Sequence, residues 1–432
     1  MAPTEASSGR LTRPAGDLPG RHRLHGTRSS VSDRLPWPWL FPLLAYGATM
    51  ILIVVTWQVA NAIYGTSESW SFYFLFKDAA HYLEIAQSGY PSKLVFPPPV
   101  VHHPYNPFYL VNLPAAYNPL ITYKAPVPPA PYPYLPAFFP AWPGLIWLAH
   151  WVTLGHWVAG GLLASIVSGG AAALGVWAVA DRVADRVVAD RAVVAFCLFP
   201  GAMTFGMLYS EPLAIAIAAA VLLAMLDRRW LLAGLLAAVG TAERPTLLVL
   251  TGVLAIGAVV AVWERREWRA LLAAPLSLAG LALFFGWLGH RYHDLAFWFA
   301  TEKHGWSEKI DGGEHTLKLL LWRPSSGADK YPFYTILLTI MLAAGIAGIA
   351  FMIRRRLPWQ LTLFTILTLL ACLVSNAQSS KPRFVWSAFG IFIGFAAVNL
   401  PRWLFWTVVV ASAGLLFFLV GWWPQHYVGP AP

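Results

Sequence analysis

Long apolar windows recur along the chain and alternate with short polar segments. Windows of about 17–25 residues with almost no charge can each cross the hydrocarbon core of a bilayer as a helix. We place spans at roughly 38–64, 157–180, 192–208, 212–226, 230–242, 246–263, 270–289, 333–353, 359–375, 384–400 and 402–421. The segment 138–151 is apolar but broken by two prolines, so we expect a short or half-penetrating helix there. The pattern predicts an all-α polytopic membrane protein with eleven or twelve spans.

The polar segments divide the chain into four parts. Residues 1–35 are rich in Pro, Gly, Ser and Arg, which predicts a disordered cytoplasmic tail, and 36–64 hold the first transmembrane helix. Residues 65–136 are expected as a long extracytoplasmic loop, whose proline-rich second part excludes a continuous helix. Residues 137–432 then form a multi-span domain, with outside loops at 291–332 and 375–383.

Composition agrees with a membrane protein: 58% of the 432 residues are hydrophobic and 12% are charged. The net charge of +10 comes from short arginine runs between apolar windows, "DRRW" at 227–230, "ERREWR" at 264–269 and "RRRLPW" at 354–359. Cytoplasmic anchoring explains these runs, and no aromatic-basic groove pattern suggests nucleic acid. We therefore expect an integral protein of a bacterial plasma membrane with its N-terminus in the cytoplasm.

The remaining polar clusters fall on one side of the predicted topology. If the arginine runs are cytoplasmic, then "YSEP" (209–212), "AERPT" (242–246), the loop 291–332 and "SNAQSSKPR" (375–383) face outside. The polar island "FKDAAHYLEIAQSGY" (76–90) lies on that same side. An active site facing outside is the expected consequence, since charges next to lipid are functional candidates by default.

The island has the pattern of an interfacial helix. Its apolar positions recur at helical spacing, at Ala79, Tyr82, Leu83 and Ala86, while His81, Glu84 and Ser88 lie on another face. Asp78 stands at the start, where a carboxylate can cap free backbone N–H groups. Taken alone, capping is the favoured explanation, but its position beside the membrane and facing the other clusters makes Asp78 a candidate for chemistry.

Each of the other charged positions allows a structural and a functional interpretation. Glu211 either caps the helix that begins at Pro212 or supports a site. Glu243 and Arg244 either pair with each other or line a cavity. Lys381 and Arg383 either grip a phosphate or snorkel to lipid headgroups.

The loop 293–310 mixes Glu302, Lys303, His304 and two tryptophans, Trp298 and Trp306. That composition suits stacking on a sugar or binding a phosphate, although a solvated loop explains it equally well. His102 and His103 adjoin each other without a third ligand, so a metal site is not predicted there. Cys197 and Cys372 both lie in apolar windows, which argues against a disulfide or a thiolate metal site.

The segment "KDAAHYLEIAQSGYP" resembles the motif of an acid followed by His/Tyr-Leu-x-Ile-Ala-x-x-Gly-Tyr in membrane mannosyltransferases of the PIG-V type, within the GT-C superfamily. Further blocks follow in the family's order: "FFPAWPGLIWL", "LYSEPLAIAIA", "TAERPTLLVL", "DLAFWFATEKHGW" and "KPRFVWSAFGIFIGFA". Together they cover roughly residues 70–400. The chain departs from the motif at Lys77, where the family usually has an aromatic residue, and at Pro245 and Thr246.

This resemblance implies a GT-C-like helical bundle and inverting transfer of a sugar, usually mannose, from a polyprenyl-phosphate donor. The acceptor hydroxyl would belong to a glycan, a glycolipid or a protein. Asp78 would act as general base, and a cation among Arg244, Lys303, Lys381 and Arg383 would stabilise the leaving phosphate. His81 and Glu84 would bind acceptor or merely face water, and a divalent cation is left open as an assisting cofactor.

Two other classes of function remain open. A polytopic transporter or flippase for lipids or sugars would place charges near mid-membrane and show internal repeats, whereas these charges gather at one side and no repeat is visible. A non-catalytic subunit of envelope assembly would tolerate Asp78→Asn without effect.

Overall fold

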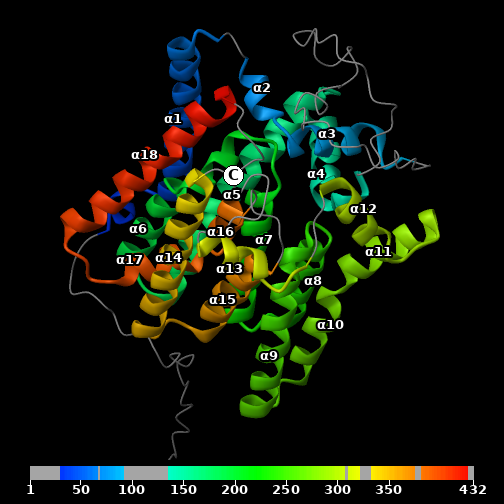
Figure 1. Cartoon of the computed structure of the whole chain (residues 1–432). Helices are drawn as coiled ribbons and strands as arrows, with labels where there is room; N and C mark the ends of the chain where they lie inside the picture. The colour runs from blue at the N-terminus through cyan, green and yellow to red at the C-terminus, as the bar shows by residue number, and fades with distance from the viewer. Residues whose placement is uncertain are drawn as a thin grey trace, which may run out of the picture.

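The computed structural model describes residues 30–66, 69–91, 135–306, 310–321, 332–374 and 381–426. These residues form a bundle of helices (Figure 1). By length and composition, six stretches of the described residues can each cross a membrane. Two of them are single helices, Leu40–Tyr64 (α1) and Trp157–Val183 (α5). The others are Pro245–Arg265, which contains α9 (Leu248–Arg265); Trp268–Tyr292, which contains α10 (Ala273–Ser277) and α11 (Ala279–Tyr292); Thr335–Arg354 within α14 (Pro332–Arg354); and Arg402–Trp422 within α18 (Arg402–His426). The all-α polytopic class is therefore confirmed.

Three further apolar helices are shorter: α7 (Glu211–Leu226), α8 (Trp230–Thr241) and α15 (Trp359–Leu373). The predicted half-penetrating segment forms α4 (Ala141–Val152), a helix of 12 residues. Because these helices are shorter than an ordinary span of about 20 residues, the total of eleven or twelve crossings stays a prediction.

Two predicted spans are broken. α6 (Arg186–Cys197) and the 3-10 helix η4 (Pro200–Gly206) meet at an angle of 73° where Pro200 interrupts the chain. The span predicted at 384–400 is divided into α16 (Lys381–Ser387) and α17 (Gly390–Ala397). Trp386 of α16 packs directly on Gly201 of η4, where an added Cβ would lie 2.7 Å from the indole Cγ. The two breaks thus bring η4 and α16 together.

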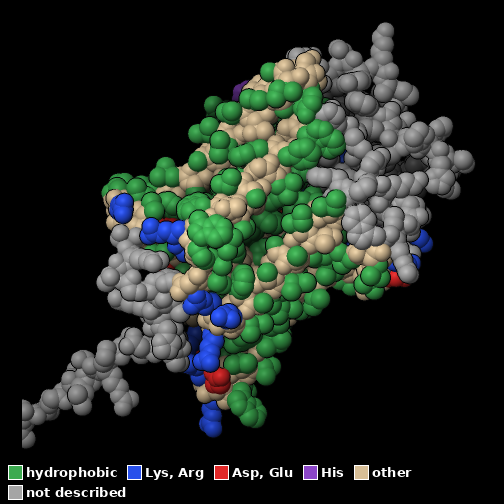
Figure 2. All heavy atoms as spheres, turned by 60° about the vertical axis from the view of Figure 1, so that its left-hand side comes forward, with side chains coloured by type: hydrophobic (Ala, Val, Ile, Leu, Met, Phe, Trp, Pro, Cys, Tyr) green, Lys and Arg blue, Asp and Glu red, His purple; other side chains and the backbone are tan. Residues whose placement is uncertain are grey.

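The short helices run as antiparallel hairpins that separate acids from arginine runs. α7 begins at Glu211 and ends before Arg228, α8 returns to Glu243, and α9 leads away again to Arg265. Arg228 of the first turn contacts Glu267 of the second at 3.3 Å, so both basic turns lie at one end of the bundle. The outer face on the α1 and α18 side is largely apolar, with Lys and Arg side chains near its margin (Figure 2), as a lipid-facing surface requires.

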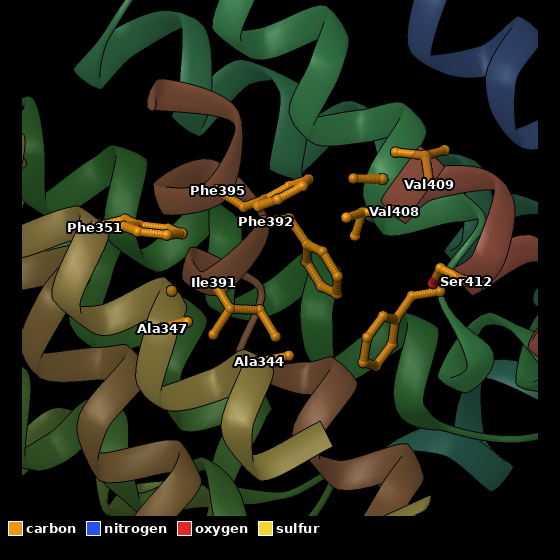
Figure 3. A pocket seen from close by; sticks show the side chains of 12 residues that line it. Ala344, Ala347, Phe351, Ile391, Phe392, Phe395, Val408, Val409 and Ser412 are labelled. Atoms are coloured by element: carbon orange, nitrogen blue, oxygen red, sulfur yellow. The ribbon is translucent and has the colours of Figure 1, made fainter. Parts of the chain in front are cut away.

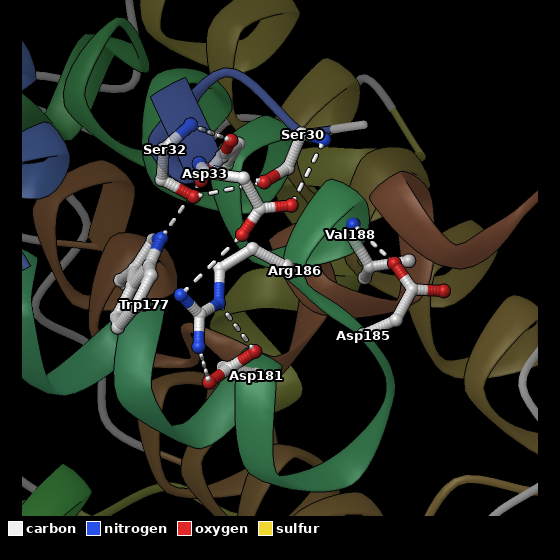
Figure 4. Close-up of polar contacts among 9 residues, drawn as sticks. Ser30, Ser32, Asp33, Trp177, Asp181, Asp185, Arg186 and Val188 are labelled. Carbon is white, nitrogen blue, oxygen red and sulfur yellow. Dashed lines mark hydrogen bonds and ion pairs between the residues drawn. The ribbon is translucent and has the colours of Figure 1, made fainter. Parts of the chain in front are cut away.

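The start of the described chain is docked against α5 and α6 (Figure 4). The backbone N–H of Ser32, in η1 (Ser32–Arg34), donates to Asp190 Oδ2 at 2.9 Å, and the indole of Trp177 donates to the other oxygen at 2.9 Å. Arg186 pairs with Asp33 at 3.6 Å and with Asp181 at 3.1 Å. The last residues of the predicted tail 1–35 are therefore packed on the bundle, while residues 1–29 lie outside the described residues.

Candidate active site

The polar island forms helix α3 (Asp78–Ser88), within one residue of the predicted start. It follows α2 (Trp70–Phe74) and packs against α4, and its Ala79, Leu83 and Ala86 belong to the main hydrophobic core. One of the two alternatives for His81 is contradicted: its side chain does not face water but is 4% exposed, with its ring 5.1 Å from that of Phe138. A role in acceptor binding stays a prediction. α3 lies closer to the core than an interfacial helix would, because α4 covers part of its second face.

An ionic network joins this helix to three other parts of the chain. Arg383 of α16 donates from Nη2 to Asp78 Oδ2 at 2.7 Å, and its Nε lies 3.4 Å from Glu211 Oε1. The other oxygen of Glu211 lies 3.5 Å from Arg244 Nη2, and Arg244 Nε lies 3.0 Å from Glu243 Oε2. Asp78, Arg383, Glu211, Arg244 and Glu243, the ionic network, thus alternate in charge along one line.

Burial differs along the ionic network. The side chains of Glu243, Glu211, Arg383 and Arg244 are 0%, 3%, 8% and 11% exposed, whereas that of Asp78 is 21% exposed. Charges this far from water need partners, and each of these has at least one. Asp78 is the member of the ionic network that a substrate can reach most easily.

The contacts decide between some of the sequence interpretations. Asp78 is the first residue of α3, and its carboxylate is engaged by Arg383 rather than serving only as a helix cap. Glu211 opens α7 with Pro212 behind it, and its side chain bridges two arginines. Glu243 and Arg244 do pair with each other, and the same arginine also reaches Glu211. Both glutamates therefore belong to one buried ionic cluster.

A framework of backbone contacts and hydroxyls holds the ionic network in place. Arg244 Nη2 donates to the Ser210 hydroxyl, which lies 3.0 Å from the hydroxyl of Tyr82 on α3. The guanidinium of Arg383 sits 4.8 Å from the ring of Tyr209. Trp142 Nε1 donates to the carbonyl of Leu208 at 3.2 Å. Sequence reasoning missed Tyr82, Tyr209 and Ser210 as site residues, although the last two stand in the "YSEP" cluster that it singled out.

The pKa values of Asp78 and Glu243, the carboxylates at the two ends of the ionic network, are shifted in opposite directions. Burial alone would raise the pKa of Asp78, but the charge and hydrogen bond of Arg383, with smaller help from His81 and Lys77, hold that pKa below its usual range. Burial raises the pKa of Glu243 to about 7, because Arg244 and the Ser210 hydroxyl only partly offset it. Asp78 is therefore ionised at neutral pH, while Glu243 takes up a proton near pH 7.

The remaining candidates are not brought into the ionic network by the contacts described. Lys381 is fully buried and donates to the hydroxyl of Thr316 on α13 (Glu314–Leu320). Lys303 is exposed on α12 (Phe297–Trp306), and the side chains of His304 and Trp306 lie outside the described residues, as does the proline-rich insert with His102 and His103. Glu84 is 36% exposed and 4.0 Å from His81.

Two further features of the described residues are the distribution of metal-ligating side chains and an apolar cavity. Within the described part of the chain, no three His, Cys, Asp or Glu side chains converge as a metal site needs. Each carboxylate of the ionic network faces a guanidinium group, and we derive no step through a metal. A cavity of about 220 Å³ among α6, α14, α17 and α18 (Figure 3) is lined almost wholly by apolar side chains, with Ser412 the exception.

Comparison with known proteins gives distant structural likenesses. No family model matches the chain, and a search of curated proteins finds no match. ArnT from Cupriavidus metallidurans, solved with undecaprenyl phosphate, is similar over 66% of this chain and 55% of its own, at 17% identity and a TM-score of 0.44. The oligosaccharyltransferase AglB from Archaeoglobus fulgidus, solved with an inhibitory peptide and a dolichol-phosphate, is similar over 90% of this chain and 56% of its own, at 11% identity and a TM-score of 0.46.

The apo form of the Archaeoglobus fulgidus oligosaccharyltransferase gives 12% identity and a TM-score of 0.48, over 90% of this chain and 56% of that one. This chain spans little more than half the length of each of these proteins. With identities and TM-scores this low, nothing about activity is taken from them, and the ionic network has to carry the functional conclusion.

Proposed function

We propose that the protein is an inverting glycosyltransferase of the GT-C type, which moves a sugar from a polyprenyl-phosphate donor to an acceptor hydroxyl at the membrane surface. One observation carries the proposal: a reachable carboxylate, Asp78, is held by a buried arginine, Arg383, at the end of the bundle opposite the basic turns. A lipid-linked donor enters such a site sideways from the bilayer, so base and cation have to stand at its edge. The ordered sequence blocks around both residues support the same reaction.

In the proposed reaction Asp78 accepts the proton of the acceptor hydroxyl while its oxygen attacks the anomeric carbon of the sugar. The bond from that carbon to the phosphate oxygen breaks on the opposite face, which inverts the configuration. The polyprenyl phosphate leaves with the bonding electron pair, and a fixed guanidinium stabilises the charge that develops on it. Arg383 is our candidate for this role, since it already stands next to the base.

The Asp78–Arg383 contact supports a coupling between donor binding and base strength. While Arg383 holds Asp78, the low pKa of the carboxylate makes it a weak base. A donor phosphate that draws the guanidinium to itself removes this partner, and the pKa of Asp78 then rises. Asp78 becomes an effective base only when the leaving group is already in place, which protects the enzyme from unproductive proton transfer.

The same proposal assigns mannose as the sugar and the extracytoplasmic face as the site of reaction. Mannose follows from the resemblance to the PIG-V type. The placement follows from the arginine turns, which lie at the end of the bundle away from the ionic network and favour the cytoplasmic side. A glycan, a glycolipid or a protein would supply the acceptor hydroxyl.

The test is transfer from polyprenyl-phosphate mannose to acceptors of a membrane extract by purified Asp78→Asn protein. Asparagine keeps the shape of the side chain and can still accept from Arg383, but it cannot take a proton, so kcat should fall by about 10²–10⁴-fold. Asp227→Asn is the matched control, because Asp227 is 45% exposed in a surface pair with Arg182. Near wild-type transfer by Asp78→Asn would overturn the assignment of the base. No transfer by the wild type from mannose, glucose or pentose donors would overturn the reaction itself.

A further inference from the structure

Lys77, immediately before α3, has an unusual backbone conformation. Its φ is 53° and its ψ is −118°, a region that glycine occupies easily and that costs any other residue about 1–3 kcal/mol. The turn is fixed on both sides: Leu208 N–H donates to the carbonyl of Phe74 at 2.9 Å, and Ala80 N–H donates to the carbonyl of Lys77 at 3.0 Å. Glycine would relieve the strain here, yet the chain carries a lysine at this point.

The side chain of Lys77 lies inside the protein, and Lys77 directly precedes Asp78 of the ionic network in the sequence. Lys77 is 6% exposed, and its Nζ lies 5.7 Å from the centre of the Phe76 ring. Lysine is seldom buried to this degree without a charged partner. Burial lowers the pKa of Lys77 to about 7; the charge of Asp78 opposes this shift and the charge of Arg383 adds to it. The ammonium therefore interacts electrostatically with both partners of the Asp78–Arg383 ion pair.

The charge balance shows what this lysine adds. Asp78, Glu211 and Glu243 bring three carboxylates, whereas Arg244 and Arg383 bring only two guanidinium groups, and each arginine lies within 3.5 Å of two acids. With all acids ionised, these five residues carry a surplus negative charge that would repel a phosphate. Lys77 cancels this surplus, and protonation of Glu243 then makes the site positive.

We propose that Lys77 is a donor-binding residue, whose ammonium holds the phosphate of a polyprenyl-phosphate ligand together with Arg383. This inference rests on the proposed function and names a cation that the resemblance does not supply, because the family motif has an aromatic residue at this position. The strained turn fixes the start of the side chain, so little freedom is lost when the ammonium meets its anion.

A purely structural role for Lys77 makes a different prediction. If the lysine only balanced Asp78, its loss would lower the melting temperature and leave the affinity for phosphate unchanged. In the donor-binding role, Lys77→Gly and Lys77→Met both weaken phosphate binding, whichever way the melting temperature of the ligand-free protein moves. The affinity for phosphate is therefore the readout that separates the two roles.

The experiment measures binding of a short-chain polyprenyl phosphate to the full-length protein in detergent, by tryptophan fluorescence and thermal shift. The uncharged polyprenol of equal chain length separates the contribution of the tail. Wild type should bind the phosphate more tightly than the alcohol, and Lys77→Gly and Lys77→Met should lose about tenfold to a hundredfold in Kd for the phosphate alone. Lys77→Arg should recover part of this loss, and the exposed-pair control Lys318→Met should match wild type.

The outcomes separate the two proposals. If wild type prefers the phosphate and both Lys77 variants bind it as tightly, the role of Lys77 is overturned and the proposed function stands. If wild type does not distinguish phosphate from alcohol, the polyprenyl-phosphate donor is overturned, and the role of Lys77 with it.

Discussion

Replacing Glu211 with glutamine tests whether the ionic network acts as one unit. Glu211 is 3% exposed and bridges Arg383 at 3.4 Å and Arg244 at 3.5 Å. At an effective dielectric constant near 20, each contact contributes about 5 kcal/mol of gross attraction. Most of this is offset by desolvation and by repulsion from Asp78 and Glu243. Removing one partner of a buried ion pair costs about 3–5 kcal/mol, and we expect the lower value because each arginine keeps its closer acid.

Thermal unfolding in detergent measures this cost. A loss of about 3 kcal/mol lowers the melting temperature of a chain of this size by about 3 °C or more. Glu314→Gln is the matched control: it makes the same chemical change in a helical pair with Lys318 that is 67% and 49% exposed, where about 0.3–0.5 kcal/mol is expected. A Glu211→Gln protein that melts within error of the Glu314→Gln protein would refute the reasoning that the bridged arginines depend on this acid.

Two further predictions concern other parts of the structure. The pKa of Glu243 is raised to about 7 from an ordinary 4.5, so the folded state binds more protons than the unfolded state between these pH values. Stability therefore falls as pH rises through that window, by about 3 kcal/mol in total. In melting experiments across this pH range, Glu243→Gln should lose this pH dependence, and an unchanged dependence would contradict the prediction. In α11, Gly280→Ala should destabilise the folded protein by at least about 1–3 kcal/mol, because the added Cβ would lie 2.7 Å from the backbone nitrogen of Ala242. The control Gly286→Ala has nothing within 4 Å of its added Cβ and should be neutral or stabilising. Equal melting temperatures of the two variants would show that the close approach does not exist.

The fold class could be predicted because hydrophobic windows report directly on helices in lipid. The starts of α3 at Asp78 and of α18 at Arg402 agree with the same pattern, whereas α18 continues to His426, beyond the predicted end at 421. The two broken spans were not predicted. Hydropathy averages over a window, so it passed over Pro200, which is visible in the sequence, whereas the packing of Trp386 on Gly201 depends on a distant part of the chain and is not. A continuous apolar sequence does not specify a continuous helix when another segment of the chain packs at the point where the helix is broken.

The sequence indicated which residues to consider for the candidate site, but it did not indicate which of them contact one another. Charges beside lipid singled out Asp78, Glu211, Glu243, Arg244 and Arg383, and these are the residues that the structure joins. Which acid meets which arginine depends on the crossing of distant helices, which periodicity does not encode. The water-facing alternative for His81 failed because other parts of the chain, among them Phe138, cover what a lone amphipathic helix would expose. Lys77 was noted only as a departure from a motif because its importance lies in a backbone angle.

The link between Asp78 and Arg383 also has a consequence for how the protein is made. These partners are 305 residues apart, so Arg383 is synthesised long after Asp78. During synthesis Asp78 is made long before Arg383, and Glu211 has only Arg244 of its two arginine partners until α16 arrives. The ionic network is therefore complete only once α16 is in place, and a chain that stops before α16 lacks the contact between Asp78 and Arg383.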